Sequence, residues 1–417
     1  MSIFFLTQKH KSLTSNFFHL SLIRFINIST KFFLVAYLVR VLGEKTFGLL
    51  TWSEAILQYF IVFINFGFNL YGARYVVHYK NDRGMLNKAI STIYIIKGLA
   101  FLISLILLGI LFYFNSFNAN YKILYVLLIA TLGDLLFPIW YFQGTEKMKL
   151  LSKSVLIAKL LLISITFFLI NRSEDVLVYT LLFAISQILM GTLGFIALKK
   201  DIDFIFKIPE KRFILEVTKT AKYYLLGNIS MLIFNALTIF IIGYYLTLEK
   251  VTGFDVCLKI VFICILPFEI LQAVVLPVIT KTQSKTELKK YFILSLVLGF
   301  TLYCILFFLG DNLLLLFGGE NILKYSGTLK KLSLLLLTVP ATFILGQCGF
   351  VAFGNDKRYN FSLTVVAILY FIIVMGLVLS QKLSFDTIVW LRVFSDYLLF
   401  GILVFQAFKT KIFYLKW

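Results

Sequence analysis

The sequence is poor in charged residues, histidine and cysteine, and it contains no long polar stretch. Charged residues make up 14% of the 417 residues, and there are only 3 histidines and 4 cysteines. So few histidines argue against a metal site. The cysteines all lie in apolar segments, where we expect them to pack as small apolar side chains without a disulfide. A GxxxxGK[ST] nucleotide loop is not present, and the sequence shows no soluble domain of the kind on which a membrane glycosyltransferase usually carries its nucleotide-sugar site. We predict no cofactor, no catalytic residues and no enzymatic activity.

Apolar side chains dominate what is present. They make up 60% of the chain, and the mean hydropathy is +0.93. A helix of about 20 apolar residues crosses the ~30 Å hydrocarbon core of a bilayer, and segments of this length recur from Phe17 to Phe408. We therefore predict an all-α integral membrane protein with about twelve transmembrane helices. The predicted spans are 17–39, 48–72, 90–114, 120–142, 150–170, 176–198, 222–246, 252–279, 291–309, 330–353, 361–380 and 388–408.

The basic residues are concentrated in every second gap between these spans. The middle gap 199–222 holds seven of them, whereas the gap after the first span holds only Arg40 and Lys45. Under the positive-inside rule, the basic gaps and both termini are cytoplasmic. The gap 310–330 fits less well, because it places Lys324 and Lys330 outside. The net charge of +20 thus follows the topology, and without a soluble basic domain nucleic acid is not an expected partner.

A short internal repeat indicates two halves of six helices. Glu44-Lys45 follows the first predicted span, and Glu249-Lys250 follows the seventh, at an offset of 205 residues. An even number of spans in each half gives a parallel repeat, an architecture typical of transporters that bind substrate between the halves. The predicted parts are an N-terminal lobe at 1–198, a cytoplasmic linker at 199–221 and a C-terminal lobe at 222–417.

Several polar residues remain inside the predicted spans. A Lys or Arg at the centre of a span costs about 2.5–3.5 kcal/mol, so it normally faces a cavity or a partner. Lys31 and Lys159 are deep and have no acid three or four residues away, so we expect them to face a hydrated cavity. The predicted cavity cations, which would bind substrate, are Arg24, Lys31, Lys97, Lys159 and Lys259. The predicted polar or ion-coupling residues beside them are Glu54, Asn65, Asn69, Asp134 and Glu269.

Other interpretations remain open for several of these residues. Lys97 lies within reach of the interface, where it would be structural. Asp255–Lys259 and Arg392–Asp396 have i,i+4 spacing, so they are either neutralising pairs or cavity groups, and Arg392 is also placed to snorkel. In the second predicted span, Glu54, Gln58, Asn65 and Asn69 are expected to lie within about 60° of one another on one helical face.

Three stretches resemble a known family. LVRVLGEKTFGLLTWSEAILQYFIVFINFGFNLYGAR at 38–74, LFPIWYFQGTEKMK at 136–149 and LLFGGENILKYSGTLKKLS at 315–333 are similar to bacterial oligosaccharide flippases. This is the polysaccharide transporter branch of the multidrug/oligosaccharidyl-lipid/polysaccharide (MOP) exporter superfamily. The second stretch is the most specific, since it carries the FPxWxFQGxExM pattern. Its matching residues include Pro138, Trp140, Phe142, Gln143, Gly144 and Glu146.

The resemblance implies a function. Such proteins move an undecaprenyl-pyrophosphate-linked oligosaccharide from the cytoplasmic to the outer leaflet of the bacterial inner membrane, for O-antigen or capsule synthesis. Two six-helix lobes alternate access to a cationic central cavity. The implied partners are the lipid-linked oligosaccharide and membrane lipid, with a polysaccharide polymerase and chain-length proteins as further candidates. Proton or sodium is the candidate coupling ion, acting through Asp134, Glu54 or Glu269.

Three alternatives compete with this interpretation. A cationic-drug exporter of the same superfamily should have a net-acidic cavity, unlike the predicted one. A flippase for a peptidoglycan lipid precursor is closer, although it often carries extra spans. A membrane polysaccharide polymerase usually has a large external loop, whereas the longest external gap here is about 20 residues.

Overall fold

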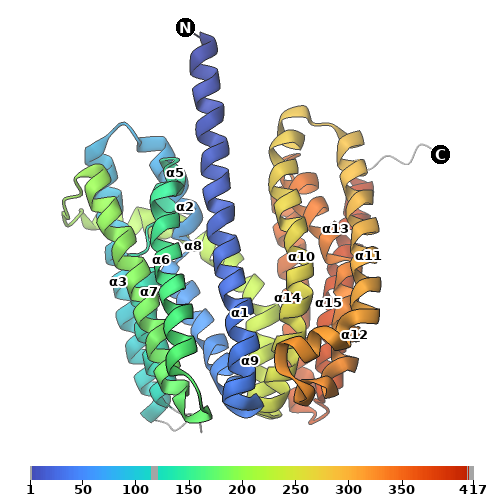
Figure 1. Cartoon of the computed structure of the whole chain (residues 1–417). Helices are drawn as coiled ribbons and strands as arrows, with labels where there is room; N and C mark the ends of the chain where they lie inside the picture. The colour runs from blue at the N-terminus through green and yellow to red at the C-terminus, as the bar shows by residue number, and fades with distance from the viewer. Residues whose placement is uncertain (1, 114–120, 411, 413–417) are drawn as a thin grey trace. The chain divides into compact units, whose positions relative to one another are not determined.

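The protein is almost entirely helical. The computed structural model describes residues 2–113, 121–410 and 412 (Figure 1), and within these ranges it contains helices and no strand. Within the described residues, ten segments are long and apolar enough to cross a membrane. The prediction of an all-α, multi-pass membrane protein is therefore confirmed.

The chain divides into two compact units. The first comprises Met1–Leu34 and Val41–Ile229, and the second comprises Val35–Arg40 and Ser230–Trp417. The first contains most of α1 (Ser2–Asn65), α2 (Phe68–Tyr79), α3 (Arg83–Tyr113), α4 (Tyr121–Leu136), α5 (Ile139–Gly144), α6 (Met148–Leu169), η1 (Ser173–Asp175), α7 (Val176–Ile202) and nearly all of α8 (Lys211–Leu232). In this unit α7 packs against both α4 and α6 (Figure 1).

The second unit is built around two long helices, α10 and α11, which pack against each other. Its elements are the π-helical turn η2 (Ile233–Leu237), α9 (Thr238–Tyr245), α10 (Leu248–Thr282), α11 (Lys285–Gly318), η3 (Glu320–Tyr325), α12 (Ser326–Ser333), η4 (Leu334–Leu337), α13 (Val339–Phe343), η5 (Ile344–Val351), α14 (Asp356–Leu379) and α15 (Phe385–Lys409).

The ten segments differ from the predicted twelve in two places. The first two predicted spans form the single segment Ser21–Asn65, which is interrupted at Gly43 by a non-helical backbone with φ 76° and ψ 164°. The predicted span 222–246 is divided among the end of α8, η2 and α9, and its apolar part is the shorter helix Ile233–Tyr245. The number twelve and the cytoplasmic placement of the termini stay predictions.

The second predicted span also ends earlier than its hydropathy suggests. Phe66 and Gly67 have φ angles of 48° and 77°, so α1 ends at Asn65 and α2 begins at Phe68. A shared helical face requires a continuous helix. The prediction that Asn69 lies on one face with Glu54 and Asn65 is therefore wrong.

The connection after α7 is shorter than the predicted linker at 199–221. Helix α7 continues to Ile202 and α8 begins at Lys211, which leaves only 203–210 non-helical. This segment is held against the start of α3, where Arg83 pairs with Asp203 at 3.6 Å and Lys88 pairs with Glu210 at 3.9 Å.

The repeated Glu-Lys pairs occupy equivalent local positions. Glu44 and Lys45 follow the break at Gly43. Glu249 and Lys250 lie in the first turn of α10, where the side chain of Thr247 caps the helix by accepting from the Lys250 amide at 3.3 Å. Each pair thus lies at the start of a helical segment, and the internal repeat stays a prediction.

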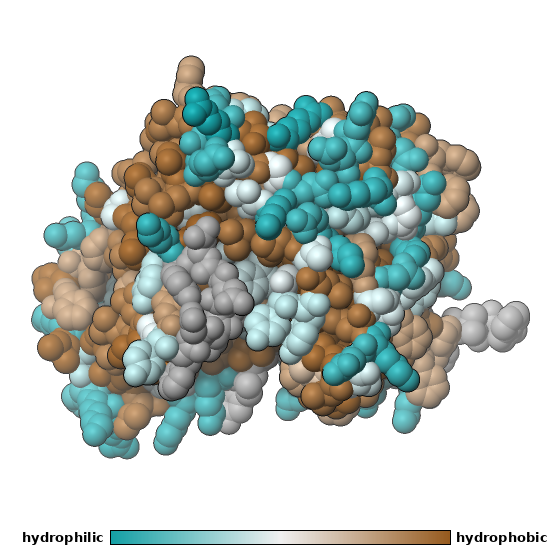
Figure 2. All heavy atoms as spheres, turned by 90° about the horizontal axis from the view of Figure 1, so that it is seen from below, coloured by the Kyte–Doolittle hydropathy of each residue, from teal (hydrophilic) through white to brown (hydrophobic). Residues whose placement is uncertain are grey.

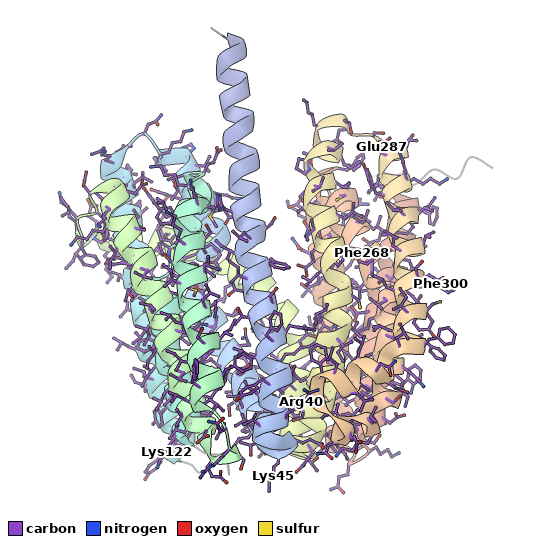
Figure 3. All side chains as sticks on the ribbon, in the orientation of Figure 1. Arg40, Lys45, Lys122, Phe268, Glu287 and Phe300 are labelled. Atoms are coloured by element: carbon purple, nitrogen blue, oxygen red, sulfur yellow. The ribbon has the colours of Figure 1, made fainter. Side chains whose placement is uncertain are left out.

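Polar side chains mark the helix ends. In the first unit Lys45 and Lys122 lie at the same end, and in the second unit Arg40 and Glu287 lie at opposite ends (Figure 3). Figure 2 looks onto helix ends and shows hydrophilic residues interspersed among hydrophobic ones. Along the helices large apolar side chains face outward, such as Ile106, which is 63% exposed, and Phe300, which is 58% exposed. Such surfaces suit a lipid environment, since they are far more apolar than a soluble protein tolerates.

Candidate functional site

A close crossing of two helices forms the centre of the first unit. A Cβ atom added to Gly133 on α4 would lie 2.1 Å from the backbone oxygen of Gln187 on α7. A Cβ added to Gly191 on α7 would lie 2.3 Å from the oxygen of Gly133. Small residues allow helices in membranes to approach closely. The crossing therefore brings Asp134, next to Gly133, and Gln187, one turn from Gly191, to the same level of the unit.

Helix α4 ends at this level because of a proline. In an α-helix the carbonyl of residue 134 accepts from the amide of residue 138, but Pro138 has no N–H group. The last regular bond is from the Phe137 amide to the Gly133 oxygen, at 2.9 Å. The carbonyls that follow lack helical donors, and an unsatisfied carbonyl is costly in a membrane.

Two side chains from α3 supply the missing donors. The Lys97 ammonium donates to the Asp134 backbone oxygen at 2.6 Å, and the Tyr94 hydroxyl donates to the Leu136 oxygen at 3.1 Å. Lys97 is only 1% exposed. The structure thus supports the structural interpretation of Lys97, which holds the broken end of α4.

Lys159 has different surroundings. It lies on α6, is 7% exposed, and its ammonium nitrogen is 3.3 Å from the Gln187 side-chain oxygen and 5.6 Å from the centre of the Phe183 ring. A neutral amide and an aromatic face orient a cation without cancelling its charge. Lys159 is therefore a buried lysine whose nearest side-chain contacts are a neutral amide and an aromatic ring.

Further charged groups surround Lys159. It interacts electrostatically with Lys31, Asp134 and Glu54, and Asp134 interacts with Lys97 as well as with Lys31 and Lys159. We call these five residues the charge cluster. Lys31 and Glu54 lie on α1, before and after the break at Gly43, and the other three lie on α3, α4 and α6, namely Lys97, Asp134 and Lys159. It holds three lysines and two acids, so its formal charge is positive.

Lys31 differs from the other lysines of the cluster because its side chain is exposed. Like charges repel, so its interaction with Lys159 is unfavourable. Lys31 and Lys159 are therefore one exposed and one buried lysine, and an anion bound beside both would stabilise their charged forms.

The remaining predicted residues lie elsewhere. The Arg24 side chain lies outside the described part of the structure. Asn65 is half-buried at the end of α1, and Asn69 is exposed in the first turn of α2. Lys259 and Glu269 belong to α10 of the second unit.

The second unit contains the two predicted i,i+4 pairs. Lys259 lies 2.5 Å from the Asp255 carboxylate, and Arg392 is paired with Asp396 on α15. Arg392 is 4% exposed, so it is buried rather than snorkelling. It also contacts the Asn235 side-chain oxygen at 3.4 Å, which joins α15 to η2.

Sequence reasoning missed Gln187 and the glycine crossing. The Gln187 side chain accepts a hydrogen bond from Lys159. The signal in the sequence is an amide in the middle of an apolar span, which predicts a hydrogen bond to another helix. Nothing in the sequence pairs Gly133 with Gly191, because their contact depends on how α4 and α7 cross.

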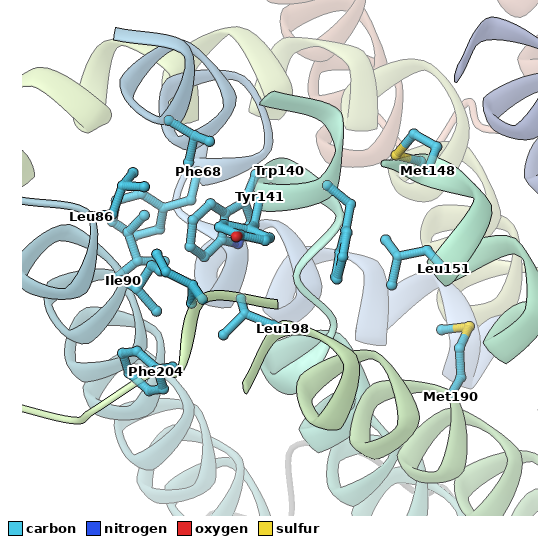
Figure 4. Packing of buried hydrophobic residues seen from close by; sticks show 14 of the residues in the cluster. Phe68, Leu86, Ile90, Trp140, Tyr141, Met148, Leu151, Met190, Leu198 and Phe204 are labelled. Carbon is cyan, nitrogen blue, oxygen red and sulfur yellow. The ribbon is translucent and has the colours of Figure 1, made fainter. Parts of the chain in front are cut away.

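The FPxWxFQGxExM stretch has a packing role in the structure. Trp140 and Phe142 are both fully buried, and Trp140 lies among side chains of α2, α3 and α7 (Figure 4). A Cβ on Gly144 would lie 2.7 Å from the Val76 Cβ, so this glycine allows α5 to lie against α2. The motif fills the core beside the break in α4.

Comparison with known proteins identifies the family. The profile of a family described as "Polysaccharide biosynthesis protein" matches residues 13–283. A protein of Escherichia coli strain K12 named "Putative O-antigen transporter" is 30% identical over 166 residues, which is 40% of this chain and 40% of that protein. A protein of Shigella dysenteriae with the same name is 24% identical over 349 residues, covering 82% of this chain and 87% of that protein.

Solved structures share the fold. Lipid II flippase MurJ in an inward closed conformation has a TM-score of 0.73 and 16% identity, covering 93% of this chain and 87% of that chain. A multidrug resistance MATE family transporter of the MOP superfamily in an inward-facing conformation has a TM-score of 0.70 and 14% identity, covering 92% and 94%. At these identities the likeness shows the fold alone. The chain belongs to the polysaccharide biosynthesis protein family and has the fold of the MOP superfamily.

Proposed function

We propose that the protein is a flippase for undecaprenyl-pyrophosphate-linked oligosaccharide in the bacterial inner membrane. It moves the repeat unit from the cytoplasmic to the outer leaflet for O-antigen or capsule synthesis. Its family, its ten apolar segments and the names of its curated relatives support this proposal. The transport is alternating access, and no catalytic step is involved.

The observation that carries the proposal is the buried ammonium of Lys159. A lysine inside a bilayer costs about 2.5–3.5 kcal/mol unless it has a partner or a hydrated surrounding. Lys159 contacts a neutral amide at 3.3 Å. The charge cluster has only two acids for its three lysines, so the acids do not balance the positive charge. A phosphate anion is the partner that completes this arrangement.

The pyrophosphate of the substrate binds between Lys31 and Lys159. An anion there stabilises both ammonium groups and removes their mutual repulsion. Gln187 holds Lys159 in place before the substrate arrives, which lowers the cost of ordering a long side chain.

The other candidate residues have subsidiary roles in this proposal. Asn65 and Asn69 bind sugar hydroxyls, since amides both donate and accept hydrogen bonds. Glu54 or Asp134 takes up a coupling proton or sodium ion. Lys259 is already paired with Asp255, so it and Glu269 bind substrate less strongly than the charge cluster does.

The membrane potential favours this direction of transport. Each negative charge moved outward gains about 2.3 kcal/mol per 100 mV of inside-negative potential. Export of a pyrophosphate therefore does not require ATP, in keeping with a sequence that has no nucleotide loop.

Complementation of a strain that lacks its own repeat-unit flippase tests the proposal. The wild-type chain should restore surface glycan, and Lys31→Ala with Lys159→Ala should not. The matched control is Lys149→Ala with Lys153→Ala, which removes two exposed lysines from α6 and should complement fully. Full complementation by the Lys31/Lys159 variant at equal membrane levels would refute the role of the cluster.

A further inference from the structure

A hollow of about 570 Å³ lies on the second unit, between the start of α14 and the end of α15. Its volume falls within the range of small-molecule sites, about 300–1,000 Å³. It is lined by Arg358, Gly401, Ile402, Phe405, Gln406 and Lys409. Two of these side chains are cationic and none of the described lining residues is acidic. The hollow thus carries positive charge and is separate from the charge cluster of the first unit.

The hollow is polar at one end and apolar along its length. Arg358 lies in the first turn of α14, and Lys409 is the last residue of α15. Both are exposed cations at the ends of membrane-spanning segments. Phe405 and Gly401 lie one and two turns further into α15, which at 1.5 Å per residue is about 6 and 12 Å deeper. Charge therefore sits at the level of lipid head groups and the apolar wall at the level of acyl chains.

A hydrogen bond joins the two walls. The Gln406 amide nitrogen donates to the Ser362 hydroxyl at 2.9 Å, and that hydroxyl donates to the Arg358 backbone oxygen at 3.0 Å. These bonds join α15 to the turn of α14 that carries Arg358. Gly401 leaves space on the α15 side, since a Cβ atom added there would have nothing within 4 Å. The hollow is thus a preformed feature of the fold.

We propose that this hollow binds an anionic phospholipid. Arg358 and Lys409 hold the phosphate group through charge-assisted hydrogen bonds, for which guanidinium is especially suited. The adjoining acyl chain lies along Phe405 and Ile402, in the space left by Gly401. Phe405 is 69% exposed, so a chain at this position covers apolar surface. Basic pockets between helices at the membrane interface are typical sites for anionic lipid head groups.

Native mass spectrometry of the full-length chain in detergent tests this proposal, with dioleoyl phosphatidylglycerol as the probe. The wild-type protein should retain phosphatidylglycerol and should retain phosphatidylcholine about tenfold less. Arg358→Gln with Lys409→Gln should weaken phosphatidylglycerol retention about tenfold, the effect of losing charge-assisted contacts. Lys289→Gln with Lys290→Gln is the matched control, because it removes two exposed lysines from α11.

A second pair of variants separates binding from folding. Gly401→Phe fills the hollow with both cations in place and should also lose phosphatidylglycerol. Gly401→Ala adds a methyl group to open space and should retain it. Equal retention by the pocket and control variants would overturn the proposal. Competition by inorganic phosphate at the same molar concentration would overturn it too, since it would show a site for free anions rather than for lipid.

Discussion

Lys97→Met tests whether this lysine supports the broken end of α4. The substitution keeps a long apolar side chain and removes the ammonium that donates to the Asp134 oxygen at 2.6 Å. A hydrogen bond to a charged group contributes about 1.5–3 kcal/mol, and a buried carbonyl left without a donor costs about 1–3 kcal/mol. Removing a buried charge offsets part of this loss. We expect a net decrease of about 1–3 kcal/mol in the free energy of unfolding.

A double-mutant cycle with Pro138→Ala tests whether Lys97 replaces the donor that Pro138 lacks. Pro138→Ala restores an amide that can donate to the Asp134 carbonyl, so Lys97 is then less needed. Lys97→Met should cost about 1–2 kcal/mol less in the Pro138→Ala background than in the wild type. Unfolding free energies from chemical denaturation of the four proteins in detergent give the coupling energy.

Lys88→Met provides the control for this cycle. Lys88 also lies on α3, but its ammonium pairs with Glu210 at 3.9 Å and lies 4.6 Å from the centre of the Phe213 ring on α8. Its effect should add to that of Pro138→Ala. If Lys97→Met and Pro138→Ala were also purely additive, the idea that Pro138 frees the carbonyl that Lys97 binds would be refuted.

Two other substitutions probe packing and buried charge. Gly133→Ala places a methyl group 2.1 Å from the Gln187 backbone oxygen and should destabilise the protein by about 1–3 kcal/mol. The control Gly98→Ala places a methyl group with nothing within 4 Å and should be neutral or stabilising. Equal thermal unfolding midpoints for the two variants would contradict the close crossing of α4 and α7. Arg392→Leu leaves the partly buried Asp396 without its partner and should cost about 3–5 kcal/mol. Adding Asp396→Leu should recover most of that loss in the same unfolding assay, and no recovery would show that the pair is not the reason for the cost.

Hydropathy predicted the membrane-spanning segments well, because twenty apolar residues have few alternatives to a helix in lipid. The break at Gly43 falls in the gap that hydropathy predicted between the first two spans. Hydropathy did not reveal the interruption at Phe66, because a left-handed residue changes the backbone without changing hydrophobicity. The end of α4 could have been predicted from the sequence, since Pro138 lacks an N–H group and interrupts a helix.

The candidate site was predicted only in part. The Asp255–Lys259 pair follows from i,i+4 spacing on one helix, which the sequence displays directly. The partner of Lys159 is Gln187, 28 residues away on another helix. The partner of Lys97 is a backbone carbonyl, which every residue carries. Neither partner can be selected without knowing how α3, α4, α6 and α7 pack.

The measurement that tests the central claim most directly is the leaflet location of the lipid-linked oligosaccharide in cells with and without this protein. The proposed function predicts accumulation on the cytoplasmic leaflet in its absence, reversed by the wild-type chain and not by Lys31→Ala with Lys159→Ala. An unchanged leaflet distribution in cells that lack the protein would contradict the flippase proposal. Normal flipping with assembled glycan missing would instead indicate a polymerase.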